Sequence, residues 1–420
     1  MRLVQRRTPN RRRDVLRARV AEGKKTVKVA ISGAGIAGPT LAYWLWCYGH
    51  EPVVIENAPR LRTGGYVVDF WGAGYAIAQS MGLTADLHAA GYDVHDLRLV
   101  DRRGHKVGGF GVDAFRRTMS GRFITVPRGD LAAMIHHRMD GHVETLFGES
   151  ISAIAQDDSG VQVSFDSGQS RPFDVVIGAD GIHSPLRDLV FGPEAKFEKD
   201  LGYRVAAFEA VGYRPRDELV YLAYTTPGRM VARFAMRDDR TLFLFVFTDG
   251  HMAGPDPRNL GETKSVLRRA FGGAGWECPQ ILHELDRVCE VYFDRVSQIV
   301  MDSWSLGRVA VIGDAACAVS LLAGEGTGLA MIEAYVLAGE LHRAGGDHRA
   351  AFRRYERLLR PLVAQKQKSA RAFASAFAPN TPLGLWTRNQ ASKLLNVRLL
   401  ADWIIRREFR DDIQLPAYTP

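Results

Sequence analysis

The sequence predicts an α/β fold in which a parallel, doubly wound sheet is interrupted by a mostly antiparallel sheet and followed by helices. Three observations favour this fold. Short β-branched runs that lead into glycine turns and helices occur near residue 30 and return after residue 307. Between them, the segments 203–211 and 241–247 alternate in the manner of antiparallel strands. From residue 350 to residue 409 the pattern is helical, with an interruption around Pro379–Pro382.

The composition excludes several classes of protein. The chain has 420 residues, of which 46% are hydrophobic and 24% charged, so it is long enough for two or three cores and is neither mainly disordered nor collagen-like. Its four cysteines form no C-x-x-C pair, so the sequence predicts neither a zinc knuckle nor a dithiol redox motif. No metal site is assigned. Sparse cysteine is typical of a reducing compartment, and we expect a cytoplasmic protein.

The positive charge of the chain is confined to one end. Residues 1–25 carry ten basic and two acidic residues, which accounts for the whole net charge of +8. We expect the segment 1–26 to be a disordered basic tail, or sequence upstream of a natural start near Val27. A basic arm can also bind nucleic acid or anionic lipid. This arm has no interleaved aromatic residues and no apolar face, so no nucleic-acid partner is expected.

One stretch has the length and the apolar composition of a membrane-spanning helix. Val29–His50 contains no charged residue over 22 positions. Glycines and Pro39 interrupt its first half, however, so the segment fits a strand, a turn and a helix better than a span. No apolar segment follows the paired arginines of the arm, so an export signal is not predicted either.

The first unit of the fold can be placed residue by residue. Val27–Ser32 is a buried strand, the turn GAGIAG follows, and Pro39–Tyr48 is an apolar helix with Gly49 as its C-cap. Pro52–Glu56 is the second strand of this βαβ unit.

Later elements follow the same reasoning. A glycine-rich stretch leads into a helix-like segment, an extended segment becomes helical after Arg128, and strands precede two further glycine turns. The segments concerned are Gly64–Gly74, Ile124–Met139, Val143–Phe165, Asp174–Ile177, Gly307–Ala316 and the helix Gly328–Arg343.

The first glycine turn has the pattern G-x-G-x-x-G, with Glu56 eighteen residues beyond the last glycine. The first glycine makes the tight turn, the second lets the backbone approach a pyrophosphate, and the third packs the helix on the strand. An acid at the end of the second strand accepts both hydroxyls of an adenosine ribose and disfavours a 2′-phosphate. The turn therefore predicts an FAD or NAD site made by Gly33, Gly35, Ile36, Ala37, Gly38 and Glu56.

The second motif is GADGIHSPLR, which follows a buried strand. Ser184 and Pro185 form an N-cap and N1 pair. Asp180 is expected at the carboxyl edge of the sheet, where open α/β sheets bind ligands. A strand–turn–helix without any ligand explains the same residues.

The third motif joins Gly313-Asp314 to the glycine-rich start of a helix, formed by Gly324, Gly326, Thr327 and Gly328. Asp314 can bind a ribose or ribityl hydroxyl. The positive end of the helix stabilises negative charge, which a reduced flavin carries on its pyrimidine side. This motif favours FAD, although a close packing site would also use such glycines.

In this order and spacing, the three motifs resemble those of the class A flavoprotein monooxygenases. This is the family of para-hydroxybenzoate hydroxylase, aromatic polyketide hydroxylases and tetracycline-inactivating monooxygenases. The likeness covers residues 27–365. Arg128 in VPRGDL matches the arginine that contacts FAD in this family, and Asp69 in GGYVVDFWG matches an acid near the flavin. Arg62 lies near the position of an arginine that contacts NADPH.

The resemblance implies a domain organisation and a role for each motif. It implies a Rossmann-like FAD-binding domain of the GR2 type in two parts, 27–196 and 301–365, around a substrate-domain sheet at 197–300, with a C-terminal helical segment at 366–420. The implied contacts are Glu56 with the adenosine ribose, Gly33, Gly35 and Gly38 with the pyrophosphate, Arg128 and Asp314 with the ribityl and phosphate portion, Asp180 within the motif shared by FAD and NADPH, and Thr327 and Gly328 with the isoalloxazine edge.

The chain also departs from the family pattern. Many members have His after Gly-Asp-Ala-Ala and Pro four residues later, where this sequence has Cys317 and Leu321. We interpret Cys317 as a small packing residue rather than a covalent flavin anchor. The W-x-W-x-I-P signature of the related halogenases is absent, which disfavours chlorination.

The activity that the resemblance implies is that of an FAD-dependent monooxygenase with NAD(P)H as co-substrate. One atom of O₂ would pass through a flavin C4a-hydroperoxide to an aromatic or polycyclic small molecule, as in secondary or antibiotic metabolism. Hydroxylation is favoured, and Baeyer–Villiger insertion, epoxidation and a flavin dehydrogenase or oxidase remain alternatives. No catalytic residue is assigned. Candidate substrate contacts on the inserted sheet are Tyr203, Arg204, Phe208, Tyr221, Tyr224, Arg229 and Arg233.

Overall fold

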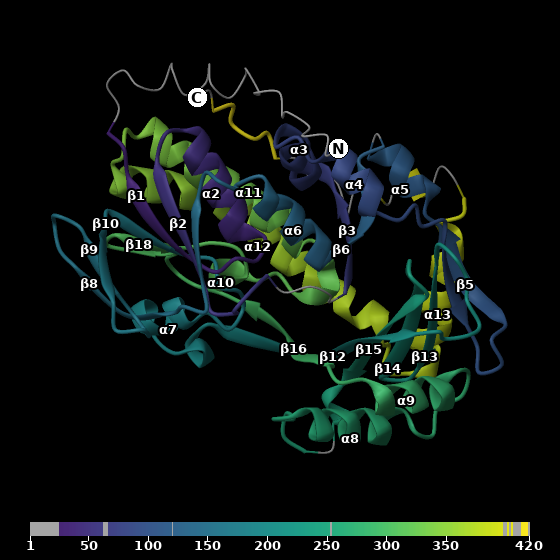
Figure 1. Ribbon diagram of the computed structural model, residues 1–420. Helices are drawn as coiled ribbons and strands as arrows, with labels where there is room; N and C mark the ends of the chain where they lie inside the picture. The colour runs from purple at the N-terminus through teal and green to yellow at the C-terminus, as the bar shows by residue number, and fades with distance from the viewer. Residues whose placement is uncertain are drawn as a thin grey trace, which may run out of the picture.

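The structure is a computed structural model that describes residues 25–61, 66–119, 121–252, 254–397, 401–402, 405 and 413–418, without the side chains of 372–374. Most of the basic tail and Arg62 therefore lie outside the described residues. Figure 1 shows the parallel sheet with its long helices in the upper half and a second sheet, carrying α8 and α9, in the lower right.

The parallel sheet has six strands in the order β17-β18-β11-β1-β2-β7. β1 lies in the middle and pairs in parallel with β11 and β2. The composition of β1 explains its central position, because a short run of Val, Ala and Ile suits a strand that is covered on both faces. The strands are β1 (Lys28–Ser32), β2 (Glu51–Glu56), β7 (Glu144–Phe147), β11 (Val175–Gly178), β17 (Ser305–Leu306) and β18 (Val309–Val311).

Different elements cover the two faces of this sheet. Alternate residues such as Val29 and Ile31 pack with three helices, α2 (Ala37–Cys47), α11 (Gly326–Arg343) and α12 (His348–Phe377). Ala30, on the other face, packs with a small antiparallel sheet. That sheet consists of β8 (Ile151–Gln156), β9 (Val161–Phe165) and β10 (Ser170–Phe173).

The second large sheet has seven strands in the order β16-β12-β15-β14-β13-β4-β5. Its strands are β4 (Asp96–Val100), β5 (Lys106–Gly111), β12 (Glu198–Val211), β13 (Val220–Thr226), β14 (Arg229–Ala235), β15 (Arg240–Thr248) and β16 (Tyr292–Ile299). β4 pairs in parallel with β13, so this sheet includes the segment 96–111, which the sequence interpretation placed in the first part of the FAD-binding domain. A pairing between segments so far apart leaves no local signal in the sequence.

The remaining elements surround these sheets. β3 (Val67–Trp71) and β6 (Phe123–Pro127) form a two-stranded ribbon between the halves. The other helices and 3₁₀ turns are α3 (Gly72–Ser80), α4 (Thr84–Ala90), α5 (Asp113–Thr118), α6 (Arg128–His137), α7 (Pro185–Phe191), η1 (Glu194–Lys196), η2 (Asp249–His251), α8 (Leu260–Phe271), α9 (Cys278–Arg287), α10 (Asp314–Cys317), η3 (Leu321–Ala323) and α13 (Pro382–Leu394).

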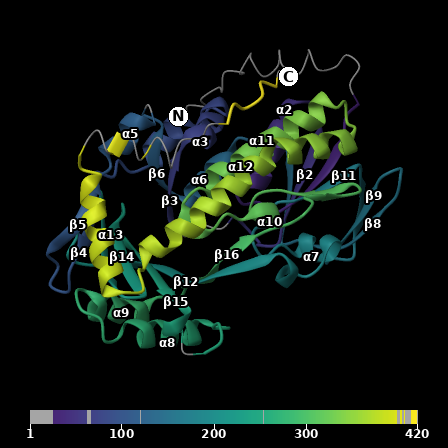
Figure 2. The same ribbon diagram turned by 180° about the vertical axis from the view of Figure 1, so that it is seen from behind.

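Figure 2 shows α12 running from the parallel-sheet half toward the seven-stranded sheet, where α13 lies beside β5. α12 is one helix through residue 365, where the sequence interpretation placed a boundary. The stretch Val29–His50 divides into β1, a turn and α2. Within the described parts of the chain, no helix is both long and apolar enough to span a bilayer.

Candidate active site

The first glycine turn is held open at the start of α2. Gly33 has a φ of +107°, and a Cβ at Gly38 would come 2.0 Å from the carbonyl oxygen of Gly33. No side chain caps the N-terminus of α2, and its first turn contains no acid. The backbone N–H groups there remain available to phosphate oxygens.

Glu56 ends β2 beside this turn. One carboxylate oxygen accepts a hydrogen bond from the backbone N–H of Ala34 at 2.8 Å, and the other accepts from that of Ala58 at 2.9 Å. Each carboxylate oxygen has a second acceptor position. The side chain is thus fixed in place and retains the capacity to bind hydroxyl groups.

The turn lies close to the other two motifs. A Cβ on Gly33 would come 2.5 Å from the carbonyl oxygen of Ala179, and one on Gly35 would lie 3.6 Å from Nη2 of Arg128. A Cβ on Gly326 would lie 3.6 Å from Oδ1 of Asp314. Segments separated by more than a hundred residues therefore meet at the carboxyl edge of the parallel sheet.

Asp314 begins α10 close to Arg128. Its side chain is exposed, yet the surrounding protein reduces its hydration and raises the pKa of its carboxyl, an effect that the charge of Arg128 opposes. A cation and a carboxylate close together can bind phosphate and hydroxyl groups respectively.

Asp180 has a structural role at the end of β11. Its carboxylate accepts hydrogen bonds from the hydroxyls of Ser32 and Ser184 and from the backbone N–H of Leu186. Burial raises the pKa of this carboxyl, and those hydrogen bonds oppose the rise. Arg187, which is fully buried, donates to the carbonyl oxygen of Ala315 and so connects this motif to α10.

The start of α11 faces the ribbon β3–β6. A Cβ on Gly74 would come 2.5 Å from the Cα of Gly328, so two helix N-termini cross there. Asp69, Trp71, Gly324, Gly328 and others line a small cavity of about 20 Å³ at this point. Thr327, the remaining predicted residue of the motif, lies buried in the first turn of α11.

Asp69 connects this region to the seven-stranded sheet. Its Oδ1 accepts hydrogen bonds from the hydroxyls of Thr125 on β6 and Tyr221 on β13, the latter at 3.2 Å. Burial raises the pKa of the Asp69 carboxyl, and both hydrogen bonds oppose that rise. The contact links the candidate flavin region to the face of the second sheet.

A buried carboxyl supports the third motif from below. Glu333 of α11 accepts hydrogen bonds from the backbone N–H of Gly313 at 2.6 Å, the hydroxyl of Tyr355 at 3.0 Å and the thiol of Cys317 at 3.0 Å. Burial raises the pKa of Glu333 to about 7, and it raises that of the Cys317 thiol well above its usual range. Cys317 is therefore a protonated packing residue.

These features fit a bound FAD. An uncapped helix start beside an acid suits the adenosine and pyrophosphate portion, and an adjacent Arg–Asp pair suits the central portion. The glycines at Gly33, Gly35 and Gly326 keep the backbone free of side chains where a ligand would approach.

A row of side chains that includes three alanines crosses the face of the seven-stranded sheet that is turned toward the ribbon. We call the row Ala223, Ala232, Leu244, Ala207 and Tyr292, which are cross-strand neighbours on five adjacent strands, the substrate floor. Leu244 is only half-buried although its strand is internal, whereas Phe243 and Phe245 beside it are fully buried against α8 and α9. Leu244, Ala232 and Tyr292 therefore keep part of their surface accessible on this face.

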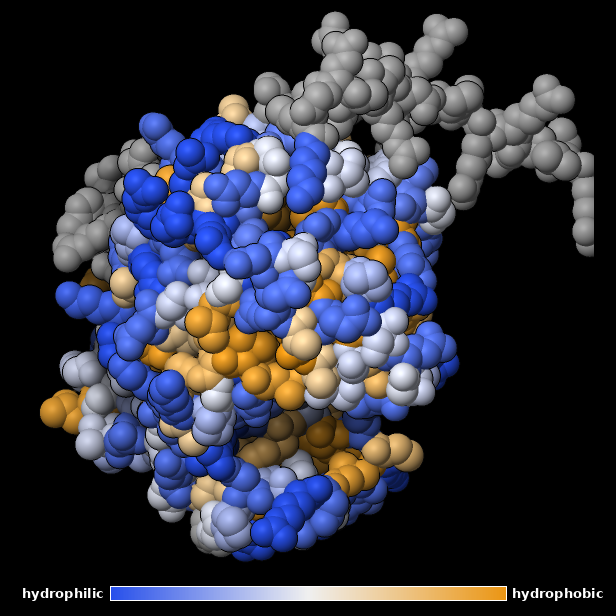
Figure 3. Space-filling view, turned by 90° about the vertical axis from the view of Figure 1, so that its left-hand side faces the viewer, coloured by the Kyte–Doolittle hydropathy of each residue, from blue (hydrophilic) through white to orange (hydrophobic). Residues whose placement is uncertain are grey.

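The floor faces the candidate flavin region. Leu244 and Tyr292 pack with Trp71 of β3 in one apolar cluster and with Leu321 of η3 in another. Figure 3 shows that one side of the molecule is hollowed between its upper and lower halves, with apolar residues in the hollow.

The arginines that were predicted to contact the substrate instead bind carboxylates or a backbone carbonyl. Arg204 pairs with Asp200, Asp249 and Asp256, and Arg233 pairs with Asp217 and Glu277. Arg229 donates to the carbonyl oxygen of Ala270. Because their charges are already balanced or hydrogen-bonded, these side chains serve the sheet and its helices.

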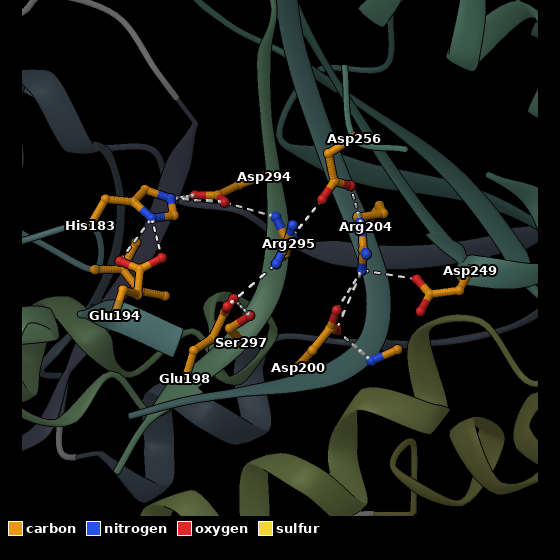
Figure 4. Close-up of polar contacts among 12 residues, drawn as sticks. His183, Glu194, Glu198, Asp200, Arg204, Asp249, Asp256, Asp294, Arg295 and Ser297 are labelled. Atoms are coloured by element: carbon orange, nitrogen blue, oxygen red, sulfur yellow. Dashed lines mark hydrogen bonds and ion pairs between the residues drawn. The ribbon is translucent and has the colours of Figure 1, made fainter. Parts of the chain in front are cut away.

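A polar network joins the two halves of the molecule beside the cleft, as Figure 4 shows. His183, from the second motif, contacts Glu194 at 2.9 Å and Asp294 of β16 at 3.1 Å. The hydrogen bond with Asp294 raises the pKa of His183 to about 9, with burial acting in the opposite direction and Glu194 adding to the rise. Arg295 and Arg204 extend the network by sharing Asp256.

A family model described as "FAD binding domain" matches residues 26–365. The chain belongs to this family, and together with its relatives this identifies it as a class A FAD-dependent monooxygenase, an oxidoreductase. A flavin-dependent monooxygenase from an unknown prokaryotic organism is 34% identical over 344 residues, which cover 82% of this chain and 88% of the relative.

Solved structures agree with this assignment. The crystal structure of tetracycline destructase Tet(51) is similar with a TM-score of 0.78 and 29% identity, covering 94% of this chain and 100% of that one. Klebsiella pneumoniae HpxO, crystallised with FAD and uric acid, has a TM-score of 0.74 at 22% identity, covering 90% of this chain and 97% of that chain, and shows the fold alone. The predicted fold class and family are confirmed.

The structure brings most predicted site residues together and adds others. Residues of all three motifs lie close together at the carboxyl edge of the parallel sheet, and Asp69 lines a small cavity with Gly324 and Gly328. Arg62 lies outside the described residues. The sequence interpretation missed Glu333, which a polar position inside an otherwise apolar helix could have indicated.

Proposed function

We propose that this monooxygenase uses NADH or NADPH and O₂ to hydroxylate an aromatic or polycyclic small molecule in the cytoplasm. The observation that carries the proposal is the apolar substrate floor opposite the three FAD-binding motifs. Tet(51), at 29% identity, is called a tetracycline destructase, which supports a polycyclic compound as the substrate class.

The bound FAD would supply electron transfer from NAD(P)H and activation of O₂. The free N–H groups at the start of α2 bind its pyrophosphate, and Glu56 binds the adenosine ribose. Arg128 and Asp314 bind the phosphate and ribityl groups. Backbone groups at Gly324, Gly326, Thr327 and Gly328 meet the isoalloxazine, where the positive end of α11 favours negative charge.

The substrate floor positions the substrate and excludes water. Its three alanines leave room for a flat ring system, and Leu244 and Tyr292 provide apolar contacts. Keeping water out of this space protects an activated oxygen species from decay. Tyr221, held by Asp69, gives the cleft a hydroxyl group at a fixed position.

The test is turnover of the FAD-loaded enzyme under ¹⁸O₂ with NADH or NADPH and a panel of phenols and polyketides. We expect one ¹⁸O atom per product, present as a new hydroxyl group by mass spectrometry. If the product were an ester or an epoxide carrying one ¹⁸O, the reaction would be Baeyer–Villiger insertion or epoxidation and not hydroxylation. An oxidised product without ¹⁸O would identify a dehydrogenase or oxidase and overturn the proposal.

A further inference from the structure

α13 packs against the edge of the seven-stranded sheet. The hydroxyl of Ser392 accepts a hydrogen bond from the backbone N–H of Gly109 at 2.8 Å, and the Asn396 side chain bonds the backbone of the same strand, β5. Arg388 lies one helical turn before Ser392 and therefore on the same face. Trp386 and Leu383, on the opposite face, are 59% and 70% exposed.

The Arg388 guanidinium has little compensation for its burial. Its Nη1 donates to the carbonyl oxygen of Ala376 at 3.4 Å, and its buried Nε has no hydrogen-bond acceptor among the described residues. Within the same part of the chain, no carboxylate lies within ion-pair distance of it. The loss of hydration lowers the pKa of Arg388 to about 10.

This cationic group differs from two buried arginines of the sheet that carry carboxylate partners. Arg204 and Arg233 are balanced by carboxylates, as described above. A partly buried cation without a counter-ion costs free energy, which an incoming anion would offset. The side-chain oxygen of Asn389, next in sequence, is also buried without a donor among the described residues.

The position of Arg388 relates it to the substrate floor. Its acceptor, Ala376, precedes Phe377 and Ala378 at the end of α12. These two residues pack in the same apolar cluster as Leu244 of the floor and Leu321 of η3. Arg388 is therefore hydrogen-bonded next to the segment that packs with Leu244 of the floor, where α12 meets α13.

We propose that Arg388 binds an anionic oxygen of the substrate, either a carboxylate or an ionised phenol or enol. The planar guanidinium donates two parallel hydrogen bonds to such groups, while the floor receives the ring system. The inference rests on the proposed function and narrows its substrate class to acidic ring compounds.

The experiment compares matched acid and ester pairs on the FAD-loaded, full-length enzyme. The probes are 3-hydroxy-2-naphthoate and anthracene-2-carboxylate, each with its methyl ester, and binding is measured from the change in flavin absorbance. The variants are Arg388→Gln, Arg388→Lys and the control Lys393→Gln, which changes an exposed residue of the same helix.

The wild type and Lys393→Gln are expected to bind at least one acid tenfold or more tightly than its ester. Arg388→Gln is expected to lose about tenfold in affinity for the acid and less than twofold for the ester, and Arg388→Lys to keep part of the preference. Equal loss for acid and ester, an unchanged preference, or a wild type without any preference would overturn the proposal. FAD content serves as the check on folding.

The same samples distinguish the two proposals. If ¹⁸O appears in the product while Arg388→Gln keeps the acid preference, the role of Arg388 fails and the monooxygenase function stands. If the preference is lost in Arg388→Gln but no ¹⁸O is incorporated, the oxygen-insertion chemistry fails and the anion site stands.

Discussion

The cofactor cleft and the substrate floor are built in different ways. The cleft consists of turns in which neighbouring residues act together, and many of its groups are backbone N–H groups at helix starts. The floor consists of single side chains from five strands, joined only by cross-strand register. Changes in the cleft should therefore affect FAD binding sharply, whereas changes in the sheet should affect substrate preference or domain contact.

The largest effect is expected at Gly38. A Cβ there meets the Gly33 carbonyl oxygen at 2.0 Å, so Gly38→Ala should displace the turn and leave the purified protein almost without FAD. Gly273→Ala, in the second half of the molecule where a Cβ meets nothing within 4 Å, is the matched control and should bind FAD normally. Flavin absorbance per protein measures both, and a fully loaded Gly38→Ala variant would contradict the account of the cleft.

This contrast also explains what could be predicted from the sequence. The βαβ unit, the three glycine motifs and the helix boundaries near Pro379–Pro382 depend on local residue patterns, and the structure has elements at those places. The parallel pairing of β4 with β13 and the engagement of Arg204 and Arg233 depend on partners far along the chain. Local sequence patterns do not indicate such distant partners, so the substrate floor and the surroundings of Arg388 could be found only in the structure.

The second prediction concerns Glu333 beneath the cleft. Its pKa of about 7 in the folded protein is above its ordinary value of 4.5, so its stabilising contribution is complete below pH 4.5 and is lost as the pH rises through 7. Relative to Glu333→Gln, the wild type should lose roughly 3 kcal/mol of unfolding free energy over that interval. Denaturant titrations at several pH values test this.

The exposed Glu290→Gln variant is the control for Glu333, because it changes the same kind of side chain without affecting the cleft. It should follow the wild type at every pH. Parallel stability profiles for the wild type and Glu333→Gln would show that Glu333 does not titrate in this range.

A smaller effect is expected at His183, which joins the two halves. Its pKa is raised from 6.5 to about 9, so the stability it provides is complete below pH 6.5 and is lost as the pH rises through 9. The side chain is 58% exposed, so solvent screening limits the effect to about 1 kcal/mol or less. His183→Gln should remove this dependence, and added salt should reduce it in the wild type. A wild type that gains stability relative to His183→Gln over this range would contradict the assignment.

The smallest effect is expected from deleting residues 1–25. The motifs and the floor lie beyond this segment, so FAD content and NAD(P)H oxidation should remain at the level of the full chain. The alternative, in which the arm binds a partner, is tested by measuring how tightly the full chain and the deletion variant bind duplex DNA and anionic vesicles. If the deletion caused loss of FAD, residues of the basic arm would contribute to the cofactor site.

The central claim, that the backbone turns of the cleft hold a complete dinucleotide, is tested most directly by titrating the flavin-free protein with FAD and with FMN. FMN lacks the adenosine and one phosphate, so the contacts assigned to Glu56 and the Gly33–Gly38 turn would be lost. The account predicts that FAD binds at least a hundredfold more tightly, about 3 kcal/mol. Equal affinity for FMN and FAD, or no binding of either flavin, would contradict it.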